Sequence, residues 1–164
     1  MKLKIEDLTP EAFAPFGEVI AQPGRAKDAS GPGWTWWGQD HLLAGGDRKY
    51  AIGYLDLQPA PLTFDWAERH MHSDELLVPM GEDCLVYVGP AEYPDEPDRL
   101  PALESFRVFR LRRGQGVLLG KAVWHGAPLA LDKPLNVAVL LLKDTGTVDG
   151  HVVRFEDTPV QIER

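Results

Sequence analysis

The chain has 164 residues, of which 44% are hydrophobic and 26% are charged, and its formal net charge at pH 7 is −8. A chain of this length is about the size of one ordinary domain and can bury a sizeable core. The acidic balance and the scattered Lys and Arg side chains exclude a large phosphate-neutralising surface, so we expect no nucleic-acid partner.

The sequence also predicts neither a membrane span nor a disulfide framework. The first thirteen residues, MKLKIEDLTPEAF, alternate charged and apolar side chains and lack the continuous apolar core of a signal peptide. The longest apolar run, NVAVLLL, is far shorter than a membrane span. Cys84 has no partner cysteine in the chain and is expected to be a small buried hydrophobe. We therefore expect a cytoplasmic protein.

The first predicted element is a short N-terminal helix in LTPEAFAPFGEVI. Thr9 is placed to cap it, Pro10 to occupy its first position, and Glu11 to lie in its first turn. Gly17 then ends the helix, and the apolar residues that follow predict a strand. This element is expected to pack on a larger body.

The rest of the chain has the punctuation of a β protein. Short runs rich in β-branched and aromatic residues are separated by Gly, Pro, Asp and Asn. The runs are 34–38, 49–57, 62–72, 75–80, 83–89, 105–111, 116–120, 135–142 and 150–155. They predict an all-β sandwich, jelly roll or small barrel, formed as a single domain over residues 1–164. The Pro- and acid-rich segment 89–106 is predicted to be a long connection inside that domain.

Two large side chains and one arginine invite predictions of their own. Trp34 and Trp36 share one face of a predicted strand, which favours a place in the core or in a dimer interface over a role in a sugar or base pocket. Arg69 is expected to point away from His70 and to form a surface or interface ion pair with Glu68 or Asp65.

The stretch from His70 to Glu75 contains most of the candidate catalytic or metal-binding side chains. If 62–72 is one strand, His70 and His72 project from the same face, because side chains alternate with a period of two. Glu75 is an odd offset further on and joins them only if the chain reverses. Ser73 and Asp74 are turn-forming residues, so we predict a tight hairpin there, with 75–80 as the returning strand.

Another candidate lies far along the chain. His125 follows a glycine-punctuated strand, and Lys121 precedes it by an even offset, so a regular strand would aim both into one cavity. Neutral imidazoles with a carboxylate suit a divalent metal such as Zn, Mn, Fe or Ni, held by His70, His72, Glu75 and His125. Without metal the same groups would serve as acids and bases. The alternative is a polar hairpin and an unrelated core histidine.

These motifs resemble the two sequence motifs of the cupin superfamily: HxH, a Glu opening the next strand, a Gly near the end of that strand, and later a Gly-rich strand ending in His. The resemblance implies a double-stranded β-helix, a jelly roll in which His70, His72, Glu75 and His125 converge inside the barrel. The match departs in the short spacing between His72 and Glu75, and in GKA where Pro-x-Gly is usual.

Within the cupins, the chain resembles the ureidoglycolate lyase family. The similar pieces are EAFAPFGEVI, ERH before ELLVPM, ESFRV before GQGVLL, and VWHGAPL. The resemblance implies a homodimeric carbon–nitrogen lyase of purine and allantoin breakdown that splits ureidoglycolate, a small anionic substrate, into glyoxylate and urea. His70, Glu75 and His125 would be catalytic, and Lys121 would either neutralise the substrate carboxylate or be a solvated lysine at the end of a strand.

Two other functions stay open at this point. One is a different metal-dependent cupin enzyme, an isomerase or dioxygenase acting on a small polar acid. The other is a non-catalytic cupin that binds a metabolite. Tightly bound metal without urea release would favour the first, and ligand binding without turnover would favour the second.

Overall fold

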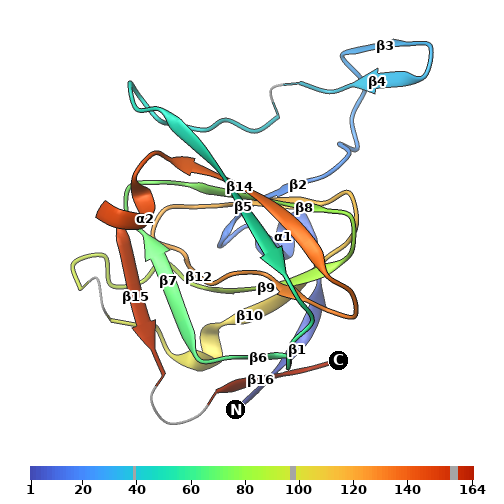
Figure 1. The fold of residues 1–164 in the computed structure, drawn as a ribbon. Coiled ribbons are helices and arrows are strands. Elements are labelled where there is room, and N and C mark those ends of the chain that lie inside the picture. Colours follow the sequence, from blue (N-terminus) through green and yellow to red (C-terminus); the bar gives the residue numbers. More distant parts are fainter. Residues whose placement is uncertain (39, 97–98, 156–158) are drawn as a thin grey trace.

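Two β-sheets pack on each other in the computed structural model, which describes residues 1–38, 40–96, 99–155 and 159–164 (Figure 1). In spatial order, the nine-stranded sheet contains β15 (Gly150–Arg154), β7 (Trp66–His70), β12 (Trp124–His125), β9 (Cys84–Gly89), β10 (Arg107–Leu111), β1 (Lys2–Asp7), β16 (Val160–Glu163) and β6 (Thr63–Phe64), and β13 (Leu129–Ala130) also pairs with β9. The five-stranded sheet contains β2 (Gly17–Ile20), β11 (Gly116–Leu119), β8 (Glu75–Met80), β14 (Leu135–Leu142) and β5 (Tyr50–Leu57).

The remaining elements are small. A separate hairpin pairs β3 (Ala29–Gly31) with β4 (Trp34–Trp36), and the helices are α1 (Pro10–Phe13), α2 (Thr145–Val148) and a 3-10 turn (Leu103–Ser105). No helix in the described part of the chain is long and apolar enough to cross a membrane. Two sheets curled around one core confirm the predicted all-β, jelly-roll class.

The predicted helix cap is confirmed. Thr9 is extended, and its side-chain oxygen accepts a hydrogen bond from the Ala12 N–H at 3.1 Å, while Pro10 opens the helix. This short helix is held by packing as well as by its cap, because Phe13 is fully buried and meets the Phe109 ring edge-on at 5.2 Å.

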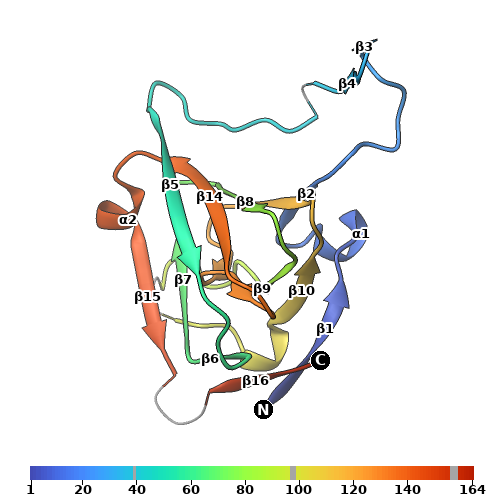
Figure 2. The ribbon, with the colours of Figure 1, turned by 45° about the vertical axis from the view of Figure 1, so that its right-hand side comes forward.

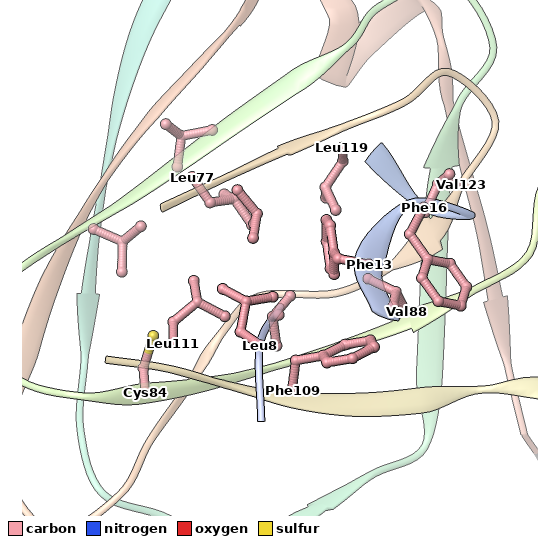
Figure 3. Packing of buried hydrophobic residues seen from close by; sticks show 14 of the residues in the cluster. Leu8, Phe13, Phe16, Leu77, Cys84, Val88, Phe109, Leu111, Leu119 and Val123 are labelled. Carbon is pink, nitrogen blue, oxygen red and sulfur yellow. The ribbon is translucent and has the colours of Figure 1, made fainter. Parts of the chain in front are cut away.

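The main core lies between the two sheets and takes side chains from both (Figure 3). Strand β9 shows how the nine-stranded sheet is buried on both faces. Its Cys84, Val86 and Val88 enter the main core, whereas Leu85 and Tyr87 enter a second apolar cluster on the sheet's outer face. A strand buried on both faces reads as a continuous apolar run, as CLVYV does.

The connection 89–106 covers that outer face, and Arg69 anchors it. Leu100, Leu103 and Phe106 of the connection pack into the second cluster. The Arg69 guanidinium lies 4.6 Å from the centre of the Trp124 ring, and the side chain is fully buried. The predicted surface position of Arg69 is therefore wrong, whereas its predicted orientation away from His70 is confirmed.

The hydrogen bonds of Arg69 explain how a cation can be buried there. Its two terminal nitrogens donate to the backbone carbonyls of Glu92, Tyr93 and Glu96 at 2.7, 3.0 and 2.8 Å. A guanidinium carries several N–H donors in a fixed planar arrangement. One arginine side chain can therefore satisfy several backbone carbonyls of a loop that forms no β-sheet hydrogen bonds.

The predicted strand 62–72 is in fact two strands, and the predicted hairpin after it is wrong. The strand β7 ends at His70, and β7 and β8 belong to different sheets. Residues 71–74 carry the chain from one sheet to the other. Ser73 fixes this crossing, because its buried hydroxyl accepts a hydrogen bond from the Leu142 N–H at 3.0 Å.

Residues 23–38 and 40–49 form an arm between β2 and β5, whose β3–β4 hairpin stands clear of the barrel (Figures 1 and 2), whereas His41 contacts Glu18 of β2. Trp34 and Trp36 are 55% and 58% exposed on this hairpin, so the prediction of a core position for them is wrong.

Candidate active site

Three ionisable side chains meet at the boundary between the two sheets. The Oε2 atom of Glu75 lies 3.1 Å from Nε2 of His70 and 3.2 Å from Nε2 of His125. The two imidazole rings are 5.3 Å apart, centre to centre. All three side chains are buried, with exposures of 8%, 5% and 3% for Glu75, His70 and His125. The structure thus brings together three of the residues predicted for the site.

Three strands position these residues. Strand β12 lies between β7 and β9, with His125 directly opposite Glu68 of β7. Glu75 opens β8 in the other sheet, where it pairs with Leu119 of β11. The sheet change at 71–74 therefore brings Glu75 to His70, in place of the reversal predicted from the sequence.

Backbone carbonyls fix the orientation of both imidazoles. The Nδ1 atom of His70 lies 3.2 Å from the carbonyl oxygen of Asp149, and that of His125 lies 2.9 Å from the carbonyl oxygen of Val123. A carbonyl can only accept, so each Nδ1 carries the proton. The Nε2 atom of each ring then faces Glu75 and donates a hydrogen bond to that carboxylate when the ring is protonated.

The charges of the cluster are strongly coupled. Burial by itself raises the pKa of Glu75, but the charges of His125 and His70 and their hydrogen bonds outweigh burial and hold that pKa well below its ordinary value. Burial lowers the pKa of His125, and the facing carboxylate outweighs this effect, so the pKa of His125 is raised overall. The cluster therefore favours an ionised Glu75 and a protonated His125.

Glu68 belongs to this cluster and was missed in the sequence. One ligand atom from each of Glu68, His70 and His125 lies within 4.8 Å of the other two. Glu68 is only partly buried, so it is the member most open to solvent. The signal was present, because Glu68 precedes His70 by two and shares its strand face.

His72 does not join the cluster. Its side chain is 74% exposed, and its Nδ1 lies 2.9 Å from a carboxylate oxygen of Asp149. That carboxylate also accepts the backbone N–H groups of Met71 and His72, at 3.0 and 2.8 Å. These bonds end β7 at His70, so the alternation that would have aligned His72 with His70 stops before it reaches His72.

The structure does not bring Lys121 to the cluster either. Strand β11 ends at Leu119, and Lys121 is exposed in the turn that follows. Ala122 in that turn has a φ of 61°, which is incompatible with an extended strand, and its N–H donates to the carbonyl of His70 at 2.7 Å. The even offset between Lys121 and His125 therefore does not place the two side chains on one face, because the strand does not continue between them.

A second cavity and the single cysteine are weaker candidates for the reaction centre. A cavity of about 580 Å³ at the base of the arm, lined by Pro10, Glu18 and His41 among others, contains none of the clustered side chains. Cys84 is fully buried, and burial raises the pKa of its thiol to about 12, so it does not supply a thiolate nucleophile. Both observations leave the cluster as the candidate site.

The donor set also fits a divalent metal. Glu68, His70 and His125 offer one carboxylate and two imidazole nitrogens from one small volume, with Glu75 beside them. Both imidazoles already donate their other N–H to a carbonyl, which is the arrangement found behind metal-ligating histidines. The residues present therefore suit a metal as well as direct proton transfer.

Comparisons with known proteins agree on one family. The family model described as ureidoglycolate lyase matches residues 1–163. A protein named ureidoglycolate lyase from Pseudomonas syringae pv. syringae (strain B728a) is 34% identical over 80% of this chain and 78% of its own. Relatives with the same name are 36% identical in Azotobacter vinelandii (strain DJ / ATCC BAA-1303), over 79% of this chain and 78% of that one, and 24% identical in Schizosaccharomyces pombe (strain 972 / ATCC 24843), over 98% and 95%.

A solved dTDP sugar isomerase from Desulfovibrio desulfuricans G20 matches 87% of this chain and 84% of its own at 15% identity and a TM-score of 0.48, a likeness too distant to bear on function. The family model and the named relatives confirm the resemblance read from the sequence motifs. The chain belongs to the ureidoglycolate lyase family.

Proposed function

We propose that this protein is a carbon–nitrogen lyase that cleaves ureidoglycolate into glyoxylate and urea, with Glu68, His70, Glu75 and His125 as its active site. The observation that carries the proposal is the buried Glu75 carboxylate held between two oriented imidazoles. Membership of the family and relatives named for this activity support the same substrate.

The reaction needs a base and an acid at one carbon. The hydroxyl of ureidoglycolate loses its proton as the carbonyl of glyoxylate forms, and the electron pair of the breaking carbon–nitrogen bond goes to the urea nitrogen, which takes up a proton. Nε2 of His70 is suited to accept the first proton, and His125, whose pKa is raised, is suited to donate the second.

Glu75 links the two proton transfers. The ionised carboxylate stabilises the imidazolium that forms on His70 and the one that His125 holds before the reaction. Because the same oxygen contacts both Nε2 atoms, it also offers a route for the proton to return from His70 to His125 after product release. Each such proton transfer typically accelerates a reaction by about a hundredfold to ten-thousandfold.

A divalent ion, Zn, Mn, Fe or Ni, would be held by Glu68, His70 and His125. When bound, such an ion would polarise the substrate's carboxylate and hydroxyl and lower the pKa of the hydroxyl. With or without it, the carbonyls of Asp149 and Val123 hold the two imidazole rings so that their Nε2 atoms lie beside Glu75.

We also propose that the protein acts as a single domain over residues 1–164, as a homodimer in the cytoplasm, on a small anionic substrate, without a nucleic-acid or membrane partner. The family resemblance supports the dimer. The net charge of −8 opposes binding to nucleic acid and to anionic lipid.

The test combines elemental analysis of the purified protein with a urea-release assay on ureidoglycolate, for the wild type and a Glu68→Gln variant. Stoichiometric metal and activity that are both lost in the variant support a metal-assisted lyase. Urea release from metal-free protein supports acid–base chemistry alone. Metal without urea release would point to the isomerase or dioxygenase alternative, and ligand binding without turnover would point to a metabolite-binding protein.

A further inference from the structure

The cavity of about 580 Å³ at the base of the arm is not used by the proposed reaction. Its volume lies within the range of small-molecule sites, about 300–1,000 Å³. A second cavity of about 380 Å³ adjoins it, because the two share Gln22, Asp40 and His41 among their lining residues. We use the name arm-base site for this pair of cavities, whose walls include Gly17, Glu18, Val19, Trp36, Asp40 and His41.

Strand β2 supplies unpaired backbone groups to the arm-base site. It is an edge strand of the five-stranded sheet, and among the described strands it pairs only with β11. The N–H of Gly120 donates to the carbonyl of Phe16 at 2.9 Å, and successive residue pairs of an antiparallel ladder alternate between bonded and non-bonded. Gly17 and Val19 therefore turn their N–H and C=O groups away from β11, at the edge where both residues line the cavity.

The charges of the arm-base site favour a cation. Its ionisable side chains are Glu18, Asp40 and His41, and the described lining residues include no Lys or Arg. Nδ1 of His41 lies 2.5 Å from Oε2 of Glu18, and Oδ1 of Asp40 pairs with Arg25 at 2.7 Å. Each pairing uses one carboxylate oxygen and leaves the other as an acceptor. Two carboxylates against at most one imidazolium keep the lining negative in either protonation state of His41.

An aromatic wall and an apolar floor complete the arm-base site. Trp36 lines the smaller cavity and is 58% exposed, so its ring can stack on a flat cation. Leu8, Pro10 and Val19 line the larger cavity and suit the hydrocarbon part of a ligand. The arm itself holds a guanidinium in a similar way, because Arg25 donates to carboxylate oxygens of Asp28 and Asp40 at 2.9 and 2.7 Å.

We propose that the arm-base site binds a small organic cation that carries a planar guanidinium or amidinium group. Such a group holds several N–H donors in one plane. The remaining acceptors are the second oxygens of Glu18 and Asp40 and the edge carbonyls of β2, so a planar group with several donors can satisfy more of them than a compact ammonium can. An anion would face two carboxylates. None of the four proposed active-site residues lines either cavity, so this is a separate site.

The experiment is calorimetric titration of the full chain with two probes of the same shape, phenylguanidine, which is a cation, and phenylurea, which is neutral. The variants are Glu18→Gln and Trp36→Ser. Glu163→Gln is the matched control, because Glu163 is also an exposed, paired carboxylate on an edge of the fold far from the arm (Figure 1). Glu75→Gln detects binding in the active site instead. Circular dichroism verifies folding of each variant.

We expect phenylguanidine to bind with a Kd at least about tenfold lower than that of phenylurea, because only the cation forms charge-assisted bonds with the carboxylates. Glu18→Gln should raise the Kd of phenylguanidine about tenfold and Trp36→Ser about fivefold, whereas Glu163→Gln and Glu75→Gln should leave it unchanged. In NMR spectra, phenylguanidine should shift the indole N–H signal of Trp36.

Three results would overturn this inference. They are equal Kd values for the two probes, an unchanged Kd in the folded Glu18→Gln variant, and loss of phenylguanidine binding in Glu75→Gln, which would place the probe in the active site. The titration uses no ureidoglycolate, so its outcome is independent of the proposed lyase activity.

Discussion

The two faces of β7 both carry buried ionisable side chains, yet they serve different ends. On one face, Glu68 and His70 lie beside His125 and Glu75. The partners in this cluster are themselves ionisable, so the cluster can exchange protons with a substrate. On the other face, Arg69 donates to three backbone carbonyls and stacks on Trp124, which secures the connection 89–106. Burial of a charge alone therefore does not mark a reactive group; the nature of its partners does.

The strongest way to break this comparison is Glu75→Gln. The variant keeps the shape of the side chain but removes the negative charge between the two imidazoles. We expect kcat for urea release to fall by about a hundredfold to ten-thousandfold, with the circular dichroism spectrum unchanged. A Glu75→Asp variant is the companion, since it restores the charge at a shorter reach. Wild-type turnover in the folded Gln variant would remove Glu75 from the active site.

For Arg69→Ala we expect a loss of stability, in contrast to the loss of activity expected for Glu75→Gln. Three carbonyls lose a charged donor and the Trp124 ring loses its cover, which we expect to cost roughly 3 kcal/mol in free energy of unfolding. For a chain of this size that lowers Tm by roughly 6–12 °C. The measurement is thermal and urea denaturation beside Arg69→Lys, which keeps the charge but not the fork. If Arg69→Ala is as stable as the wild type, the connection is held by apolar packing alone.

A substitution of Asp149 tests what ends β7, because this residue binds the backbone that directly follows the strand. Asp149→Ala removes the acceptor of the Met71 and His72 N–H groups and is expected to cost about 2 kcal/mol at pH 7. Burial raises the pKa of Asp149, but its bonds to His72 and Met71 outweigh burial and lower the pKa overall. Its contribution is therefore fully present above its ordinary pKa of 3.8 and is lost as pH falls through the lower folded value.

Urea denaturation at three pH values checks this sign. The stability difference between wild type and Asp149→Ala should be equal at about pH 7 and pH 5 and smaller at about pH 3. The free energy of unfolding of Asp149→Asn, which keeps one acceptor oxygen, should lie between those of the wild type and Asp149→Ala. A difference that grows toward low pH contradicts the assignment.

The smallest effect is expected for His72→Ala. The side chain is largely exposed, and its bond to Asp149 is a surface pair worth at most about 0.5 kcal/mol. We expect urea release within about twofold of the wild type and an unchanged metal content. Because the HxH motif assigns His72 to the metal, loss of metal in this variant would favour the sequence motif over the structure.

Local rules explain what could be predicted. The Thr9 cap and the all-β class depend on residue types and spacings within a few positions, which the sequence displays directly. The motifs also named His70, Glu75 and His125, which the fold brings together. The same rules were applied too far at His72 and Lys121, because alternation holds only while a strand continues. Glu68 was within reach of these rules and was overlooked.

The sequence by itself determined that this chain forms short strands around one apolar core, and it supplied the family motifs. Only the tertiary structure decided where β7 ends, because the bonds that end it come from Asp149, far along the chain. Only the tertiary structure sent β7 and β8 into different sheets, which placed Glu75 against His70 and left His72 outside. The physical reason is that a strand's limits depend on partners distant in sequence, whereas its alternation depends on the backbone alone.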